Sequence, residues 1–267
     1  HIFKSAGKVT GLTTTDGVYI DGHLTISGDM TGPASAGIVL RDPKVEVAVL
    51  ETARGGMLRR GIAYRQCNVG AVLNIQSDHL GLKGVDSLED LAKVKRTVVE
   101  IATDTAVLNA DDVHCLKMAE HTKSEYLCYV TMNSGHPLVR DHIKAGGRAV
   151  VLEQGMGGHM ITIYDKGQHI PLIWSHSIPA TLDGRALHNV QNAMFAAGIC
   201  FSMHVELEEI RHGLVAQLAE PVREATIAST LQRMLLDIVA VGGDFEFLAG
   251  GTGSASLAIA DISLSGF

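Results

Sequence analysis

The chain has 267 residues, a formal net charge of −7 at pH 7 and 46% hydrophobic residues. Its acidic balance argues against nucleic acid or an anionic membrane as a partner, because both repel an acidic protein. No stretch reaches the roughly 20 apolar residues of a membrane span. The four cysteines are far apart and lack the paired spacing of a zinc cluster or a disulfide framework. We therefore expect a soluble cytoplasmic chain with room for one large domain or two ordinary ones.

The first segments are rich in turn signals. Residues 1–8 read as the end of a helix that Gly7 closes, so we expect the chain to begin inside an element. Residues 13–17 (Thr-Thr-Thr-Asp-Gly) and 28–33 (Gly-Asp-Met-Thr-Gly-Pro) combine hydroxyl groups, acids and glycines. Such turns either surround a substrate phosphate or simply connect the strands of two hairpins.

Three short apolar runs predict buried parallel strands, at residues 46–51, 69–75 and 105–110. A helix is predicted between the second run and the third. A strand, a helix and a strand in this order form a βαβ unit, which places ligands at the carboxyl ends of its strands. The polar residues that follow these strands are therefore the first candidates for a site.

The predicted helix carries its own start signal. Asp86 or Ser87 can act as the N-cap, and Glu89 or Asp90 then completes a capping box. The expected buried stripe consists of Leu91, Val94, Val98 and Ile101.

Farther along, the pattern turns antiparallel and then helical. The predicted elements are strands at 126–132 and 149–152, a hairpin of 160–164 and 168–174 around a Gly turn, helices at 188–203 and 206–218, and a helix-like stretch at 226–241.

Two polar groups end the first two buried strands. Glu51 closes one strand and precedes Thr-Ala-Arg-Gly-Gly, and Asp78 and His79 follow the next. Mg²⁺ prefers carboxylate oxygen, and glycines let backbone N–H groups approach an anion. Taken singly, Glu51 also fits a surface acid before a turn, and the Asp-His pair fits an ordinary loop. Two neighbouring strands that deliver an acid and an imidazole to one edge favour a magnesium site.

Three further side chains have both a functional and a plain structural interpretation. Lys95 flanks the buried stripe of the helix, where a half-buried lysine is either chemically special or a snorkelling side chain. Asn189 and Asn192 lie near the start of a later helix. They can contact an adenine edge, although Asn189 can also be a simple N-cap. Gly250 to Ser254 lacks the Gly-Lys-Ser/Thr ending of a phosphate loop.

Six strings, taken in order, resemble the Mur-ligase-like part of the cyanophycin synthetases. They lie at residues 13–22, 28–33, 51–56, 74–81, 107–112 and 188–193. The Asp-His, Leu-Asn-Ala-Asp-Asp and His-Asn-x-x-Asn-Ala patterns are shared with Mur ligases and folylpolyglutamate synthases in general. The Thr-Thr-Asp-Gly-x-Tyr-Ile-Asp-Gly and Glu-Thr-Ala-Arg-Gly-Gly strings are more particular to cyanophycin synthetases. The resemblance implies an α/β fold like the Mur-ligase central domain, mainly a parallel sheet flanked by helices, with a smaller antiparallel region.

The resemblance also implies a reaction. In that family ATP phosphorylates a carboxylate, and an amine then attacks the acyl phosphate. Here the amine is the α-amino group of arginine, the acid is an aspartate side chain of the cyanophycin polymer, and two Mg²⁺ ions neutralise the phosphates. The full-length protein is expected to be a homo-oligomer.

Particular residues match the family's site. Glu51 and His79 match its metal ligands, and Asn189 and Asn192 match the segment that contacts adenine. Lys95 matches, with two extra residues before it, a lysine that many Mur ligases carbamylate to give a metal-binding carboxylate.

The chain departs from the family in two ways. It lacks the Gly-x-x-Gly-Lys-Thr phosphate loop, which the family has just before the helix that His1 continues. After Leu218 it lacks the Asp-Tyr-Ala-His-Asn-Pro-like turn of the family's C-terminal domain. We therefore expect an N-terminally truncated ATP- and Mg²⁺-binding domain at residues 1–218, an unassigned tail at 219–267, and no activity of the chain alone.

Two alternatives stay open. Another Mur-type ligase, acting on peptidoglycan or folate, would share the Asp-His and Asn patterns but not the Glu-Thr-Ala-Arg-Gly-Gly string. A non-catalytic remnant that serves as a scaffold would show no stabilisation by Mg²⁺ and nucleotide.

Overall fold

The computed structural model describes residues 1–77, 81, 84–216, 244–246, 252–254 and 256–261. Its centre is an 11-stranded sheet, in which the strands from β8 to β1 run parallel and two antiparallel strands are added at each end. In spatial order the strands are β10 (Gln168–Trp174), β9 (Gly158–Asp165), β8 (Arg148–Gly155), β7 (Tyr126–Thr131), β6 (Ala102–Asn109), β5 (Cys67–Val72), β13 (Ser256–Asp261), β4 (Val47–Glu51), β1 (Thr10–Thr13), β2 (Gly17–Ile20) and β3 (His23–Ser27). A two-stranded sheet of β11 (Asp244–Glu246) and β12 (Thr252–Ser254) is separate from it. The predicted α/β class, with its mainly parallel sheet and smaller antiparallel region, is confirmed.

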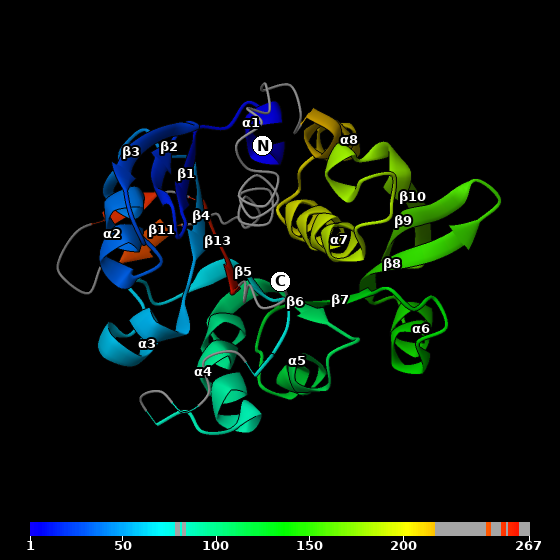
Figure 1. Cartoon of the computed structure of the whole chain (residues 1–267), viewed down its shortest axis with the longest axis horizontal. Helices are drawn as coiled ribbons and strands as arrows, with labels where there is room; N and C mark the ends of the chain where they lie inside the picture. The colour runs from blue at the N-terminus through cyan, green and yellow to red at the C-terminus, as the bar shows by residue number, and fades with distance from the viewer. Residues whose placement is uncertain (78–80, 82–83, 217–243, 247–251, 255, 262–267) are drawn as a thin grey trace.

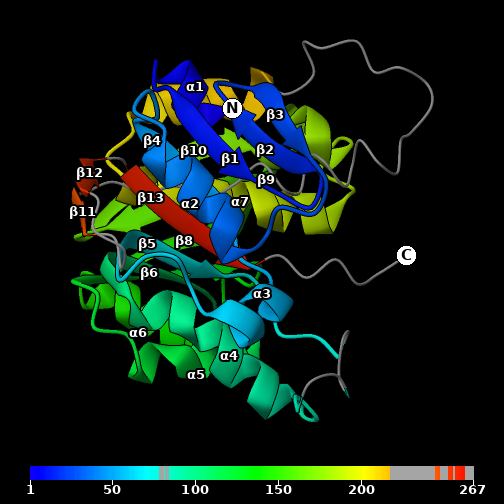
Figure 2. The ribbon, with the colours of Figure 1, turned by 90° about the vertical axis from the view of Figure 1, so that its left-hand side faces the viewer.

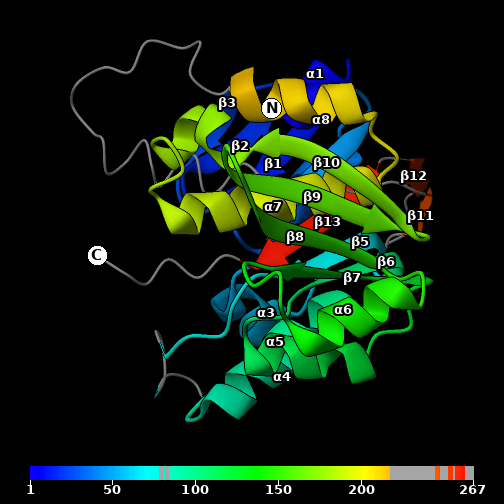
Figure 3. The same ribbon diagram turned by 90° about the vertical axis from the view of Figure 1, so that its right-hand side faces the viewer.

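Helices cover both faces of the sheet (Figure 1). The helices are α1 (Ile2–Ser5), α2 (Pro33–Arg41), α3 (Arg54–Arg60), α4 (Leu88–Glu100), α5 (Val113–Lys117), α6 (Pro137–Lys144), α7 (Leu187–Ser202) and α8 (Leu207–Val215). Short 3₁₀ turns lie at η1 (Met118–Glu120), η2 (Ser175–Ser177) and η3 (Pro179–Thr181). Figure 3 shows α4, α5 and α6 on one side of the sheet and α7 and α8 on the other. In the part of the chain that is described, no helix is long and apolar enough to cross a bilayer.

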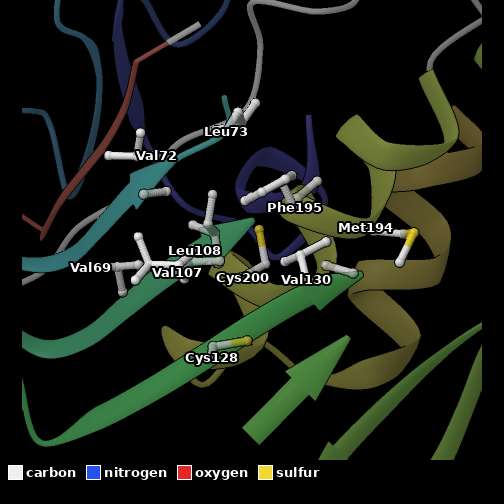
Figure 4. Close-up of a cluster of buried hydrophobic side chains, with 14 of the residues drawn as sticks. Val69, Val72, Leu73, Val107, Leu108, Cys128, Val130, Met194, Phe195 and Cys200 are labelled. Atoms are coloured by element: carbon white, nitrogen blue, oxygen red, sulfur yellow. The ribbon is translucent and has the colours of Figure 1, made fainter. Parts of the chain in front are cut away.

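The core between the sheet and α7 is dense (Figure 4). Strands β6 and β7 contribute Val107 and Val130, and α7 contributes Phe195, all fully buried. Each buried side chain of this size stabilises the fold by roughly 1.5–3 kcal/mol. Gly198 lies where α7 approaches the sheet, since a Cβ there would sit 3.1 Å from Val150 Cγ2. A larger residue at this position would require the Val150 side chain to shift by a few tenths of an ångström.

The predicted helix is α4, and its start signal operates as expected. Ser87 is the N-cap, and its Oγ accepts a hydrogen bond from the Asp90 backbone N–H at 3.1 Å. The predicted stripe needs one correction. Val94 and Ile101 are half-buried, whereas Lys95, expected at the margin, is only 3% exposed. The 3.6-residue period does place Lys95 beside the stripe, but that side of α4 is buried as well.

The expected hairpin is present and leads away from the site. Strands β9 and β10 pair through a two-residue turn in which Lys166 (φ 50°) and Gly167 (φ 77°) are left-handed, the geometry that matches the twist of a hairpin.

The N-terminal segments form one hairpin turn and one connection from a strand to a helix. Gly7 has φ 73° after α1, as predicted, and α1 packs on α8, where a Cβ on Gly213 would lie 2.5 Å from Ile2 Cα. The first Thr-rich string forms the turn between β1 and β2, with Thr14 Oγ1 accepting from the Gly17 N–H at 3.2 Å. The second string is no hairpin turn. It leads into α2, which begins at Pro33. The helix-like stretch at 226–241 lies outside the described residues.

Candidate functional site

The carboxyl ends of the parallel strands form one edge of the sheet, and the candidate site lies along it. Glu51 is aligned with Ala260 of β13, which is in turn aligned with Ala71 of β5. Figure 2 shows β13 between β4 and β5. Because β13 separates β4 from β5, these two strands are two strand spacings apart, or about 10 Å. The segments that follow β4 and β5 therefore face one another across the end of β13.

Glu51 is a carboxylate in a buried position. It is 7% exposed, and its Oε2 accepts a hydrogen bond from the Thr15 backbone N–H at 3.2 Å. The β1–β2 turn thus orients Glu51 from one side. Burying a carboxylate is unfavourable unless a donor or a cation compensates it, and a hard divalent cation suits it best.

The loop after β5 is held by side chains at three successive residues. Asn109 Nδ2 donates to the Leu73 carbonyl at 2.7 Å, Lys95 Nζ donates to the Asn74 carbonyl at 3.4 Å, and the Ile75 N–H donates to Asp112 Oδ2 at 2.7 Å. We call this segment the 73–75 loop. It leads toward Asp78 and His79, which lie outside the described residues.

Lys95 reaches the site from α4. Its side chain is buried, and Nζ meets the Asn74 carbonyl rather than extending to solvent. The snorkelling interpretation of this lysine is therefore wrong. Lys95 and Glu51 stand at the same edge of the sheet, on α4 and β4.

The two asparagines lie near the start of α7. Helix α7 begins at Leu187 with Ala186 as its N-cap, so the N-cap interpretation of Asn189 is wrong. Instead, Asn189 Nδ2 donates to the Ala180 carbonyl of η3 at 2.6 Å. Its Oδ1 is buried without a hydrogen-bond partner among the described residues, and Asn192 is half-buried one turn later.

Other groups at this edge received no role from sequence reasoning. Thr15, Asn74, Asn109 and Asp112 all position the site through hydrogen bonds. Each lies in one of the strings that carry the family resemblance, which was the available signal. Their contacts are 21 to 37 residues apart in the chain, so no local pattern reveals them.

Neither a His/Cys/Asp/Glu metal cluster nor a reactive thiol is evident in the described residues. No group of three or more such side chains is gathered there. All four cysteines are buried and free, and burial raises the pKa of Cys128 to about 12, so its thiol is protonated at neutral pH. Among the described residues, amide, carbonyl and water oxygens are the further ligands that a cation could find beside Glu51.

Family comparison agrees with the fold. The Mur ligase middle domain model matches residues 1–200, and the chain belongs to that family.

Individual relatives narrow the comparison. The chain is 48% identical over 222 residues to a cyanophycin synthetase of Nostoc sp. (strain PCC 7120 / SAG 25.82 / UTEX 2576), a match that covers 80% of this chain and 23% of that protein. It is 28% identical over 145 residues to a UDP-N-acetylmuramoylalanine–D-glutamate ligase of Brucella abortus (strain 2308), covering 54% of this chain and 27% of the relative. A crystal structure of MurF from Acinetobacter baumannii aligns with a TM-score of 0.37 at 18% identity, over 60% of this chain and 30% of that one. The chain thus spans about a quarter of the length of the cyanophycin synthetases it matches.

Proposed function

We propose that residues 1–218 form the nucleotide- and Mg²⁺-binding centre of an ATP-dependent ligase of the cyanophycin synthetase type. The reaction joins the arginine α-amino group to an aspartate side chain of a polymer, through an acyl phosphate. The observation that carries the proposal is Glu51, a buried carboxylate at the carboxyl edge of a parallel sheet. The 48% identity to a cyanophycin synthetase supports this substrate class over other Mur-type ligases.

The residues of the edge fit a magnesium ion. Glu51 supplies a carboxylate, and His79 is the proposed imidazole ligand. When bound, Mg²⁺ neutralises phosphate charge and positions the phosphoryl group. The Thr15 N–H orients the Glu51 carboxylate through Oε2.

Lys95 is the proposed carbamylated lysine of this centre. Condensation of the neutral form of its amine with CO₂ would form an N–C bond and release one proton, so that the side chain would end in a carbamate. Its burial and its position against the 73–75 loop suit a fixed ligand better than a solvated cation. The carbamate would add two oxygens to the edge.

Asn189 and Asn192 are the proposed adenine contacts. The buried Oδ1 of Asn189 is an acceptor without a partner among the described residues, and the exocyclic amine of adenine is a matching donor. Its Nδ2, held by Ala180, fixes the orientation of the amide.

The 267 residues contain no Gly-Lys-Thr phosphate loop. We therefore infer that the chain binds Mg²⁺ and nucleotide weakly and does not join arginine to the polymer by itself.

Two measurements on the purified chain test this. Mg²⁺ with ATP should raise the melting temperature by mass action. Glu51→Gln should abolish most of that rise, while Glu46→Gln, at the opposite end of β4, should keep it. Incorporation of labelled arginine into an aspartate polymer should stay at background. No thermal shift at any ligand concentration would favour a scaffold, and measurable incorporation would contradict the inactivity.

A further inference from the structure

The 73–75 loop contains a buried acceptor that the contacts described so far do not use. Asn74 is half-buried as a residue, but its Oδ1 is sealed from solvent and has no hydrogen-bond partner among the described residues. An amide oxygen left this way is costly, because it has lost its water without gaining a donor. A partner from outside the chain would remove that cost.

Hydrogen bonds hold the backbone of Asn74 and of the residues on either side of it. Its own carbonyl accepts from Lys95 Nζ, and the residues before and after it are bound by Asn109 and Asp112. Both of these side chains are themselves fixed. Asn109 Oδ1 accepts from the Asp111 N–H at 2.9 Å, and Asp112 Oδ1 caps α5. The backbone on both sides of Asn74 is therefore held in place.

We propose that Asn74 is a further ligand of the divalent cation, binding it through Oδ1 either directly or through a metal-bound water. This assignment rests on the proposed function, since it adds a ligand to the same centre. An acceptor-only oxygen is complementary to Mg²⁺ or to the hydrogens of its hydration shell, and amide oxygens are ordinary ligands of hard cations. Asn74 follows β5 as Glu51 ends β4, so the two flank the end of β13 from opposite sides.

Because Asn109 and Asp112 hydrogen-bond the 73–75 loop, they are positioning residues for the Asn74 ligand. Neither contacts the ion in this arrangement, and both act by holding the backbone of Leu73 and Ile75, on either side of Asn74. Asp111, the neighbouring acid, is a natural contrast because it binds Thr131 and the Met132 N–H at β7 and makes no described contact with the 73–75 loop.

Mn²⁺ titration of the full 267-residue chain, followed by electron paramagnetic resonance of the free ion, tests the proposal. Asn74→Leu removes the oxygen at similar volume and should weaken Mn²⁺ binding about tenfold or more. Asn74→Asp replaces the amide oxygen with a stronger ligand and should bind at least as tightly as the wild type. Asn68→Leu is the matched control: it lies at the amino end of the same strand, where Asn68 Nδ2 donates to Asp104. Its affinity should stay unchanged.

The melting temperature measured without metal distinguishes an asparagine that binds the ion from one that stabilises the fold. Asn74→Leu should melt at or above the wild-type temperature, because it removes a buried unpaired oxygen. Equal Mn²⁺ affinity of wild type and Asn74→Leu would overturn the assignment of Asn74 alone. Absence of Mn²⁺ binding by the wild type would overturn the proposed metal centre, and this ligand with it.

Discussion

At the scale of single residues, the Glu153 carboxylate, which lies outside the candidate site, makes the stability of the fold depend on pH in acidic solution. Glu153 on β8 accepts hydrogen bonds from Thr162 Oγ1 (2.7 Å), Tyr164 Oη (2.5 Å) and His169 Nε2 (2.9 Å). Burial by itself raises the pKa of Glu153, but the hydrogen bonds outweigh it and the net pKa lies below the ordinary 4.5. Burial and the hydrogen bond to Glu153 raise the pKa of Tyr164.

The sign of the pH effect follows from that lowered pKa. The folded chain favours the ionised Glu153, so this contribution to stability is complete above pH 4.5 and is lost as the pH falls through the lower, folded pKa. Glu153→Gln should therefore cost about 1–2 kcal/mol at pH 7. The difference from the wild type should vanish in more acidic solution. Urea unfolding at a series of pH values measures this.

Glu125→Gln is the control for this prediction, because Glu125 is exposed and its side chain makes no hydrogen bond among the described residues. A pH-independent loss of stability in Glu153→Gln would show that the cluster matters through packing and not through charge.

At the scale of elements, a single arginine joins two strands of the sheet to the helix on one face. Arg148 on β8 is 6% exposed; its Nε donates to Asp165 of β9 at 2.9 Å and its Nη1 to Ser202 of α7 at 3.2 Å. The guanidinium also lies 4.8 Å from the ring centre of Tyr126 and 5.1 Å from that of Phe201. A planar cation between two rings is a role that lysine does not fill.

Arg148→Met should consequently lower the free energy of unfolding by roughly 3–5 kcal/mol, because Asp165 would stay in its mostly buried place without its partner. Combining it with Asp165→Asn should recover part of that loss. Chemical denaturation of the single and double variants gives the coupling energy. Strictly additive losses would mean that the ion pair itself contributes nothing.

Sequence patterns predicted where these elements lie better than they predicted which distant residues the elements contact. The stripe of α4, its Ser87 cap and the Lys166–Gly167 turn depend on residues a few positions apart, which a local pattern contains. The bond of Asn189 to Ala180 and that of Lys95 to Asn74 depend on how distant segments meet. For the same reason, the candidate residues could be chosen from the sequence, but their surroundings could not.

At the scale of the whole molecule, the sheet is completed by a strand from the far end of the chain. Strands β4 and β5 follow one another in sequence, yet β13 lies between them and pairs in parallel with both. Without β13, the facing edges of β4 and β5 would leave backbone N–H and C=O groups without partners in the middle of the sheet. Each such buried group costs about 1–3 kcal/mol.

A chain ending at residue 216 should therefore lose cooperative thermal unfolding or melt at a much lower temperature. A chain ending at residue 261 keeps β13 and is the control. Circular dichroism during heating compares the two. If the shorter chain melts as sharply and at the same temperature, β13 is dispensable for the sheet.

By itself, the sequence determined the fold class, the identity and order of most elements up to α8, and the membership in the Mur ligase middle-domain family. These follow from short-range periodicity, capping and strings of residues, which are properties of neighbouring positions. Only the tertiary structure decided that Lys95 is buried against the 73–75 loop, that Asn74 keeps an unpartnered oxygen there, and that β13 separates β4 from β5. The physical reason is that burial and strand pairing are set by residues tens to hundreds of positions apart, and such partners leave no periodic trace in either segment.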